Sequence, residues 1–166
     1  MRPRSIVIDA DASPSGYVAW YNHYTDIPQI RRVRPALRNE RFGVQRMEML
    51  AVYFALSDNL VEIRKAVRRE KRVAIAVRSD SQSTVDQLLG RSTIRDSLMR
   101  RISAAIGKLL ARIKCTITFD HLERSHNIAG LLIEQKRRKE RELDMVQRTT
   151  LFRAPVLLGR PIALFP

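Results

Sequence analysis

The chain has very little cysteine and no long apolar run. Cys115 is the only cysteine among 166 residues, which excludes a disulfide framework and a zinc site built from several thiolates. A chain without disulfides is expected in a reducing compartment, so we expect an intracellular, cytoplasmic protein. No stretch reaches the length that spans a bilayer, and residues 1–4 lead into a strand-like segment without the apolar core of a secretory signal. We therefore expect no membrane partner.

Acidic residues are scarce relative to basic ones. The chain has 31 Lys and Arg against 17 Asp and Glu, which gives a net charge of +14. Such a charge predicts a polyanionic partner, and nucleic acid fits better than a membrane surface because the basic residues are spread along the whole chain. The alternative is a highly soluble basic protein without such a partner, since charge alone indicates partners and never mechanism.

The chain is long enough for one sizeable core and short for two, so we expect one domain over residues 1–150. An apolar, proline-containing tail over 151–166 could pack on this domain or on a partner. Periodicity and turn residues predict the elements in between. The expected strands are 6–11, 17–21, 27–33, 73–77 and 116–119; the expected helices are 45–56 followed by a basic helical turn, a helix from about 82 closed by Gly90, 93–113, and 127 to about 147.

This order of elements predicts an α/β fold. Three consecutive strands joined by short turns form an antiparallel set, and strands that alternate with helices add to it in parallel. The expected architecture is a mixed five-stranded sheet with helices on both faces.

Four acidic residues fall where strands end or where the long helix begins. Asp9 and Asp11 are two apart on the first strand and share one face, Glu48 lies among apolar residues of the helix, and Asp80 follows the fourth strand. A buried carboxylate must be paired, protonated or bound to a cation, so a metal site and salt bridges to the many arginines are both open. Carboxylates suit Mg²⁺ or Mn²⁺, and two such ions catalyse phosphodiester hydrolysis.

Three short motifs carry a resemblance to a known family. Asp11-Ala12-Ser13-Pro14-Ser15-Gly16, Met47-Glu48-Met49-Leu50-Ala51 and Ser79-Asp80-Ser81-Gln82 resemble, in this order, the three acidic motifs of the ribonuclease H family. The first is most similar to the version in reverse-transcribing elements. The resemblance implies a ribonuclease H-like fold and a pair of Mg²⁺ or Mn²⁺ ions held by Asp11, Glu48 and Asp80, with Asp11 bridging the ions. Asp9 is the alternative to Asp11.

The sequence departs from the family pattern on the last helix. The family carries a fourth acidic residue there, whereas Asn127-Ile128-Ala129 leads to Gly130 in this chain. Glu134, one helical turn further, could substitute, although an ordinary surface glutamate fits equally well. Some family members carry a histidine before this helix that helps the product leave, and His126 stands there; a loop histidine without a role is the alternative.

Several residues are candidates for substrate contacts. Asn127 and Ser81 also fit as helix caps, and a run of basic residues on a helix is often only a solvated face. With a net charge of +14, such a run predicts binding to a phosphate backbone that weakens steeply with salt. The candidates are Ser13, Ser81, Gln82, Asn127, Lys136, Arg137 and Arg138.

Three hypotheses for the function remain open from the sequence. The first is a metal-dependent endonuclease that cuts the RNA strand of an RNA–DNA hybrid, recognised by its backbone, 2′-hydroxyls and groove width. The second is a nucleic-acid-binding module of the same fold with weakened catalysis, which Gly130 favours. The third is a nuclease of the same fold that acts on DNA, such as a resolvase-like or transposase-like enzyme.

Overall fold

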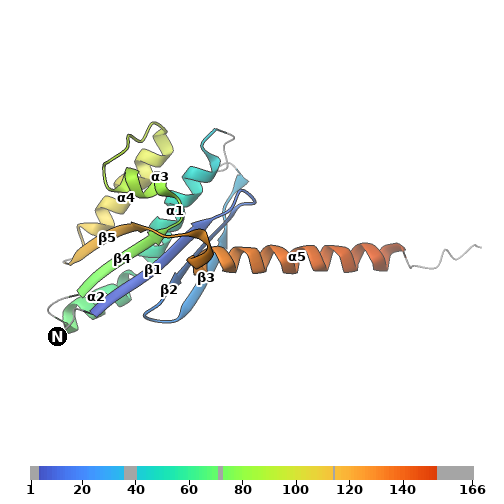
Figure 1. Cartoon of the computed structure of the whole chain (residues 1–166), viewed down its shortest axis with the longest axis horizontal. Helices are drawn as coiled ribbons and strands as arrows, with labels where there is room; N and C mark the ends of the chain where they lie inside the picture. The colour runs from blue at the N-terminus through green and yellow to red at the C-terminus, as the bar shows by residue number, and fades with distance from the viewer. Residues whose placement is uncertain (1–3, 36–40, 71–72, 114, 153–166) are drawn as a thin grey trace, which may run out of the picture. The chain divides into compact units, whose positions relative to one another are not determined.

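The computed structural model describes residues 4–35, 41–70, 73–113 and 115–152. Its centre is a five-stranded sheet with the strand order β3-β2-β1-β4-β5 (Figure 1). β1 pairs antiparallel with β2, and β2 pairs antiparallel with β3; β1 pairs parallel with β4, and β4 with β5. The expected mixed sheet is confirmed. The strands are β1 (Arg4–Ala12), β2 (Tyr17–Asn22), β3 (Ile27–Arg32), β4 (Val73–Ser79) and β5 (Thr116–His121).

Helices follow the antiparallel strands and connect the parallel ones. Two neighbouring parallel strands need a crossover connection, which is usually a helix and is right-handed. Two helices precede β4, and two more precede β5. The helices are α1 (Gly43–Asp58), α2 (Leu60–Arg69), α3 (Gln82–Leu88), α4 (Ser97–Leu110) and α5 (Ile128–Phe152), with a short 3₁₀ turn η2 (Arg124–His126) before α5.

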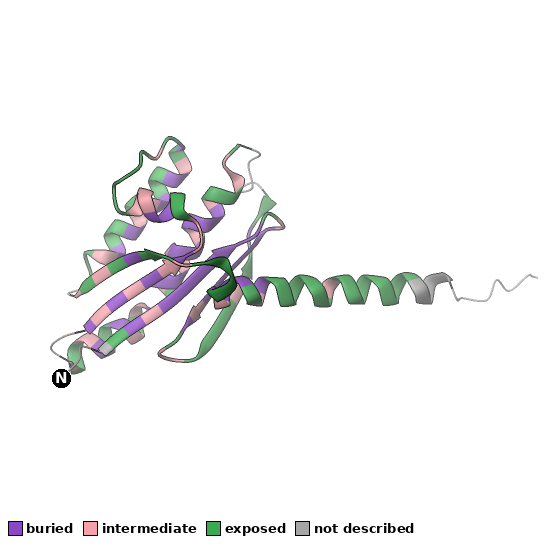
Figure 2. Cartoon of the chain, viewed as in Figure 1, coloured by how far each residue is buried: buried purple, intermediate pink, exposed green. Residues whose placement is uncertain are grey.

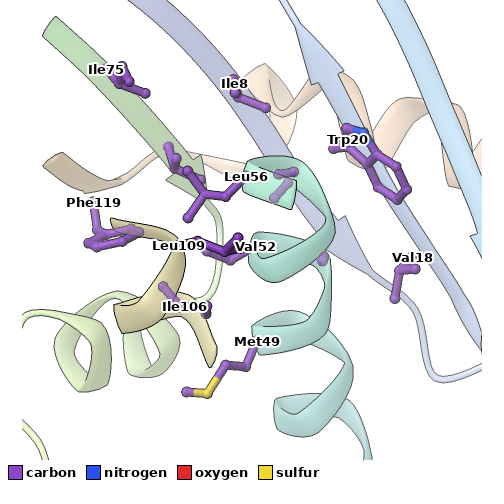
Figure 3. Packing of buried hydrophobic residues seen from close by; sticks show 14 of the residues in the cluster. Ile8, Val18, Trp20, Met49, Val52, Leu56, Ile75, Ile106, Leu109 and Phe119 are labelled. Atoms are coloured by element: carbon purple, nitrogen blue, oxygen red, sulfur yellow. The ribbon is translucent and has the colours of Figure 1, made fainter. Parts of the chain in front are cut away.

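The main core lies between one face of the sheet and helices α1 and α4. Alternation along the strands sends Ile8, Trp20 and Ile75 to this face, where Figure 3 shows them gathered around Val52 and Leu56 of α1. All five side chains are buried. Trp20 stacks on Phe54, with ring centroids 5.7 Å apart, so this strand tryptophan belongs to the core.

The opposite face of the sheet carries a smaller apolar cluster. Tyr17 and Ala19 of β2 alternate with the core residues and pack with Ala129 and Ile133 of the first turns of α5. Helices therefore contact both faces of the sheet, as the sequence predicts.

Some helix boundaries differ from the sequence-based expectations. The helix expected over 93–113 begins only at Ser97, because the Asp96 side chain accepts a hydrogen bond from the Met99 N–H (2.9 Å) and caps the helix there. The last helix begins at Ile128 and continues to Phe152, beyond the expected end near residue 147. Gly90, at φ +71°, follows α3 as predicted.

The chain separates into two compact units, Met1–Glu134 and Gln135–Pro166. In the second unit the residues from Gln135 to Arg148 are exposed apart from Glu140, which Figure 2 shows as an almost continuous green ribbon. Of the tail expected over 151–166, the first two residues belong to α5 and the other residues, 153–166, lie outside the described part. None of the described helices combines the length and the apolar character that crossing a membrane requires.

A buried ion pair joins the start of α1 to the start of α4. Arg46 donates to both carboxylate oxygens of Asp96, at 2.9 and 2.6 Å, and the two side chains are 13% and 6% exposed. The same carboxylate caps α4, and the Arg46 guanidinium is the main reason why the pKa of Asp96 falls to about 2. This ion pair fixes α1 two residues before Glu48.

We expect Asp96→Ala to lower the free energy of unfolding by about 2–4 kcal/mol, because it removes a cap and leaves the Arg46 charge half-buried without its partner. Asp58→Ala is the matched control. It breaks the more exposed Arg31–Asp58 pair (2.6 Å) and should cost less than about 1 kcal/mol. Urea unfolding of both variants measures the difference; equal losses would show that the Arg46–Asp96 pair has no special structural role.

Candidate metal centre

Three carboxylates converge at one edge of the sheet. Oxygens of Asp11, Glu48 and Asp80 all lie within 4.8 Å of one another. In the parallel register of β1 and β4, Ala10 is opposite Ser79, so the next residues along the two strands, Asp11 and Asp80, emerge side by side. The sheet register alone therefore brings two of the three acids together.

The third carboxylate comes from α1. Glu48 lies four residues before Val52 and seven before Ala55, both of which are buried, so it shares the helix face that covers the sheet. Its side chain is accordingly buried, with 6% of its surface exposed. The apolar residues around it, which drive the packing of α1, hold the acid in place.

Burial and mutual repulsion keep protons on this cluster. The pKa of Asp11 rises from 3.8 to about 7, first because burial disfavours the charged form and then because the Asp80 carboxylate is adjacent and shares a hydrogen bond. The pKa of Glu48 is also raised well above its usual value, by burial first and by the charges of Asp11 and Asp80 next. The Ala12 N–H donates to the carboxylates and opposes both shifts only partly.

The donor set fits a hard divalent cation. Oε2 of Glu48 is buried and has no hydrogen-bond partner among the residues that the structure describes. Three mutually repelling carboxylates with an unpaired buried oxygen supply the ligand type that Mg²⁺ and Mn²⁺ prefer. A cation would offset the repulsion that otherwise requires bound protons.

Asp9, the alternative to Asp11, lies outside this cluster. It is fully buried, and its carboxylate accepts a hydrogen bond from Arg78 Nε (2.7 Å) and lies 2.8 Å from His23 Nε2. Arg78 is directly opposite Asp9 in the parallel ladder. The sequence left both a salt bridge and a metal site open for these acids. In the structure, Asp9 pairs with Arg78, whereas Asp11 lies with Glu48 and Asp80.

Gly130 packs directly against the cluster. A Cβ atom built on Gly130 would lie 2.8 Å from Asp11 Oδ2, closer than real Cβ contacts allow. The position where the sequence departs from the family pattern therefore faces Asp11, and the space that a side chain would need is taken by the Asp11 carboxylate.

Glu134 is not part of the group of three acids. Its carboxylate is 58% exposed and lies 3.8 Å from Arg124 NH2. The sequence reasoning missed Arg124, which is on the short turn η2 before α5. Its positive charge reaches the cluster, since it lowers the pKa of both Asp11 and Glu48. Because the chain contains so many basic residues, the sequence does not distinguish an arginine in a loop as a functional residue.

His126 lies on the same turn and is not among the clustered acids. Its ring is 75% exposed, and Nδ1 is 3.6 Å from a Glu123 carboxylate oxygen. A different histidine touches the site: His121 Nε2 lies 3.2 Å from the backbone carbonyl oxygen of Asp80. It is the last residue of β5 and is opposite Ser79 in the sheet, a register that the sequence did not reveal.

The candidate contact residues near the cluster have structural partners. Ser13 is buried in the β1–β2 turn, with its hydroxyl 2.7 Å from that of Ser15. Ser81 caps α3 by accepting from the Thr84 N–H, as the cap alternative predicts. Gln82 is exposed and donates to Asp86 (2.9 Å) on the next helical turn.

Asn127 is fully buried and joins α5 to β1. Its Nδ2 donates to the Ala10 carbonyl (3.2 Å), and its Oδ1 accepts from the Ala129 N–H (3.1 Å) at the start of the helix. Both ends of the amide are thus engaged within the protein, which agrees with the preferred interpretation of Asn127 as a cap.

The basic run of α5 lies in the second unit. Lys136 and Arg138 approach Glu140 and Glu142 one turn on, at 4.0 and 3.0 Å. The backbone carbonyl of Arg137 accepts from Arg141 Nε (3.4 Å), and the Arg137 side chain is exposed. Such exposed i,i+4 pairs are weak, so these cations stay available to solvent and to a polyanion.

Comparison with solved structures identifies the fold. The ribonuclease H1 of Halobacterium salinarum superposes with a TM-score of 0.59 at 20% identity, covering 75% of this chain and 90% of that one. A ribonuclease H1 isolated from compost by a metagenomic approach gives 0.56 at 17% identity over 78% and 91%. The N-terminal ribonuclease H domain of a Mycobacterium tuberculosis protein gives 0.52 at 16% identity over 75% and 92%.

The compost enzyme has also been solved in complex with an RNA/DNA hybrid, and this structure matches with a TM-score of 0.53 at 17% identity, over 74% of this chain and 88% of that one. No protein-family model matches the chain, and neither does any curated protein sequence. The chain therefore has a ribonuclease H-like fold, as the three motifs predict, and the likeness lies in structure far more than in sequence.

The raised pKa of Asp11 predicts how stability changes with pH in EDTA. The unfolded chain loses this proton near pH 3.8, whereas the folded protein holds it to about pH 7, so the free energy of unfolding should fall as the pH rises through this window. The loss should be at most about 4 kcal/mol. Asp11→Asn should remove this fall of the unfolding free energy between about pH 4 and pH 7, as urea unfolding at several pH values would show. An unchanged slope in the variant would contradict the assignment.

The close approach of Gly130 to Asp11 predicts the effect of Gly130→Ala. The added methyl should displace the Asp11 carboxylate, which weakens binding of Mn²⁺ at least about tenfold while unfolding changes by less than about 2 kcal/mol. Isothermal titration with Mn²⁺ measures the affinity. Gly107→Ala is the control, because a Cβ there meets nothing within 4 Å. Equal Mn²⁺ affinity in both variants would show that position 130 does not position Asp11.

Proposed function

We propose that this protein is a metal-dependent endonuclease that hydrolyses the RNA strand of RNA–DNA hybrids. The observation that carries the proposal is the convergence of Asp11, Glu48 and Asp80 within 4.8 Å, on a ribonuclease H-like fold. The net charge of +14 and the RNA/DNA hybrid bound in the structure of one structural neighbour support a nucleic-acid substrate.

Each residue of the cluster has a distinct part in this proposal. Asp11, Glu48 and Asp80 would hold the ions, Mg²⁺ or Mn²⁺. When bound, such ions lower the pKa of a water nucleophile and neutralise charge on the phosphate and the leaving oxygen. Arg124, whose charge reaches the cluster, is placed to attract a phosphate to the same edge of the sheet.

Burial of the acids serves this chemistry. Glu48 is 6% exposed, so its carboxylate is held by packing and does not reorganise when a substrate arrives. Surface arginines and lysines would hold the duplex through its phosphates, without reading its sequence. Discrimination of the RNA strand would then rest on the 2′-hydroxyl and the width of the groove.

A second function is favoured by one specific observation. Gly130 supplies no carboxylate, and Glu134 faces Arg124, so the cluster has three acids among the described residues. A weaker metal site would leave a hybrid-binding module with little or no cleavage. Affinity and cleavage must therefore be measured separately.

We expect the purified protein to cut only the RNA strand of a labelled hybrid, in Mg²⁺ or Mn²⁺ and not in EDTA. Asp80→Asn should lower the rate at least about 100-fold, because it removes a metal ligand, while hybrid binding in EDTA persists. Asp86→Asn is the matched control, since this acid on α3 is outside the cluster.

Double-stranded DNA and RNA complete the experiment. Binding without cleavage in either metal would overturn the nuclease proposal in favour of the binding module. Cleavage of double-stranded DNA at the same rate as the hybrid would instead indicate a DNA-acting nuclease of this fold. A bound metal should also raise the unfolding midpoint of the wild type and not that of Asp80→Asn, by the linkage of binding to stability.

A further inference from the structure

A cavity lined by arginines lies at the end of the sheet opposite the three carboxylates. This cavity of about 400 Å³ is lined by Arg64, Arg68 and Arg112, with Val67 and Ile113 forming its apolar part. Arg64 and Arg68 are one helical turn apart on α2, and Arg112 follows α4. Three arginines from two separate parts of the chain therefore line one hollow.

These three arginines have no partner within the described ranges. The salt bridges and hydrogen bonds of that part of the chain involve other cations, and the acid on α2, Glu62, pairs instead with Lys65 (2.8 Å). Like charges one turn apart on a helix repel each other. Arg68 lies in the last helical turn, where the helix dipole favours a cation, but the dipole does not account for Arg64 or Arg112.

The cavity is remote from the three carboxylates. α2 ends four residues before β4 begins at Val73, and Ile113 lies three residues before β5 begins at Thr116, so the cavity borders the edge where these parallel strands start. Asp80 follows the last residue of β4. The seven residues of β4 separate the cavity from Asp80, which corresponds to about 20 Å along the strand. Figure 1 shows α2 at the end of β4 away from α3.

We propose that Arg64, Arg68 and Arg112 form a second nucleic-acid contact, which binds backbone phosphates of a duplex remote from the metal centre. The planar guanidinium fork matches phosphate oxygens in a bidentate way, and three forks around one hollow suit a phosphodiester group. The apolar wall of Val67 and Ile113 offers a surface on which a sugar can pack. The net charge of +14 favours a polyanion over a single acidic side chain.

The test uses a labelled RNA–DNA hybrid long enough to reach both ends of the sheet, in EDTA so that neither metal nor cleavage contributes. Replacing Arg64, Arg68 and Arg112 together by Gln should weaken binding at least about tenfold and reduce the slope of log affinity against log salt by about 2–3. Fluorescence anisotropy at several salt concentrations measures both quantities.

The matched control replaces Arg95, Arg100 and Lys108 by Gln, which removes the same charge from exposed positions outside the cavity. We expect this control to change the slope by less than about 1. Circular dichroism should show that both triple variants are folded, since all six side chains are exposed. Equal losses in the two triple variants, or none in the cavity variant, would overturn the proposal.

Two further arms separate this contact from the proposed nuclease. Asp80→Asn should keep the full salt slope in EDTA, so a missing metal site and a missing arginine contact give different results. Poly-glutamate tests the other class of polyanion: if the cavity variant loses binding to poly-glutamate and keeps hybrid binding, the cavity recognises acidic protein segments and the proposal is wrong.

Discussion

Repulsion among three carboxylates is the constraint on which the rest of this edge of the sheet depends. The register of β1 and β4 places Asp11 beside Asp80, and the apolar packing of α1 holds Glu48 against them. The backbone positions of all three acids are thus set by the sheet and the core. The Arg124 charge and the Ala12 N–H offset the repulsion only in part, and bound protons or a metal cation would relieve the rest, so metal binding and pH are linked at this site.

Asp9 and Asp11 of β1 differ in the groups that surround their carboxylates. Both lie on the same face of β1 and both are buried, at 0% and 6% exposure. Asp9 forms a salt bridge with Arg78, its neighbour across the parallel ladder, and lies 2.8 Å from His23 Nε2. The Asp9–Arg78 salt bridge joins β1 to β4 two residues before Asp11 and Asp80, so it supports the register that places these two acids side by side.

The sequence was sufficient where the determining interactions are local. Strand alternation, the Ser81 cap and the Gly90 break depend on neighbours a few residues away, and the structure has them as predicted. The resemblance selected Asp11 and kept Asp9 as the alternative, and the salt bridge that occupies Asp9 could not be predicted, because Arg78 lies 69 residues further along the chain. The start of α4 was misplaced although its cap is local, since Asp96 accepts from the Met99 N–H three residues on; only the ion pair of Asp96 with Arg46, 50 residues away, was out of reach.

The arginine cavity and Gly130 mark the limits of reading function from motifs. The spacing of Arg64 and Arg68 is visible in the sequence, but only the fold brings Arg112 to them. Gly130 looks like a lost ligand when it is compared with the family pattern, yet a Cβ there would collide with the Asp11 carboxylate. A side chain at position 130 would therefore require the Asp11 carboxylate to shift. The glycine at position 130 thus leaves room for the Asp11 carboxylate within the three-acid cluster.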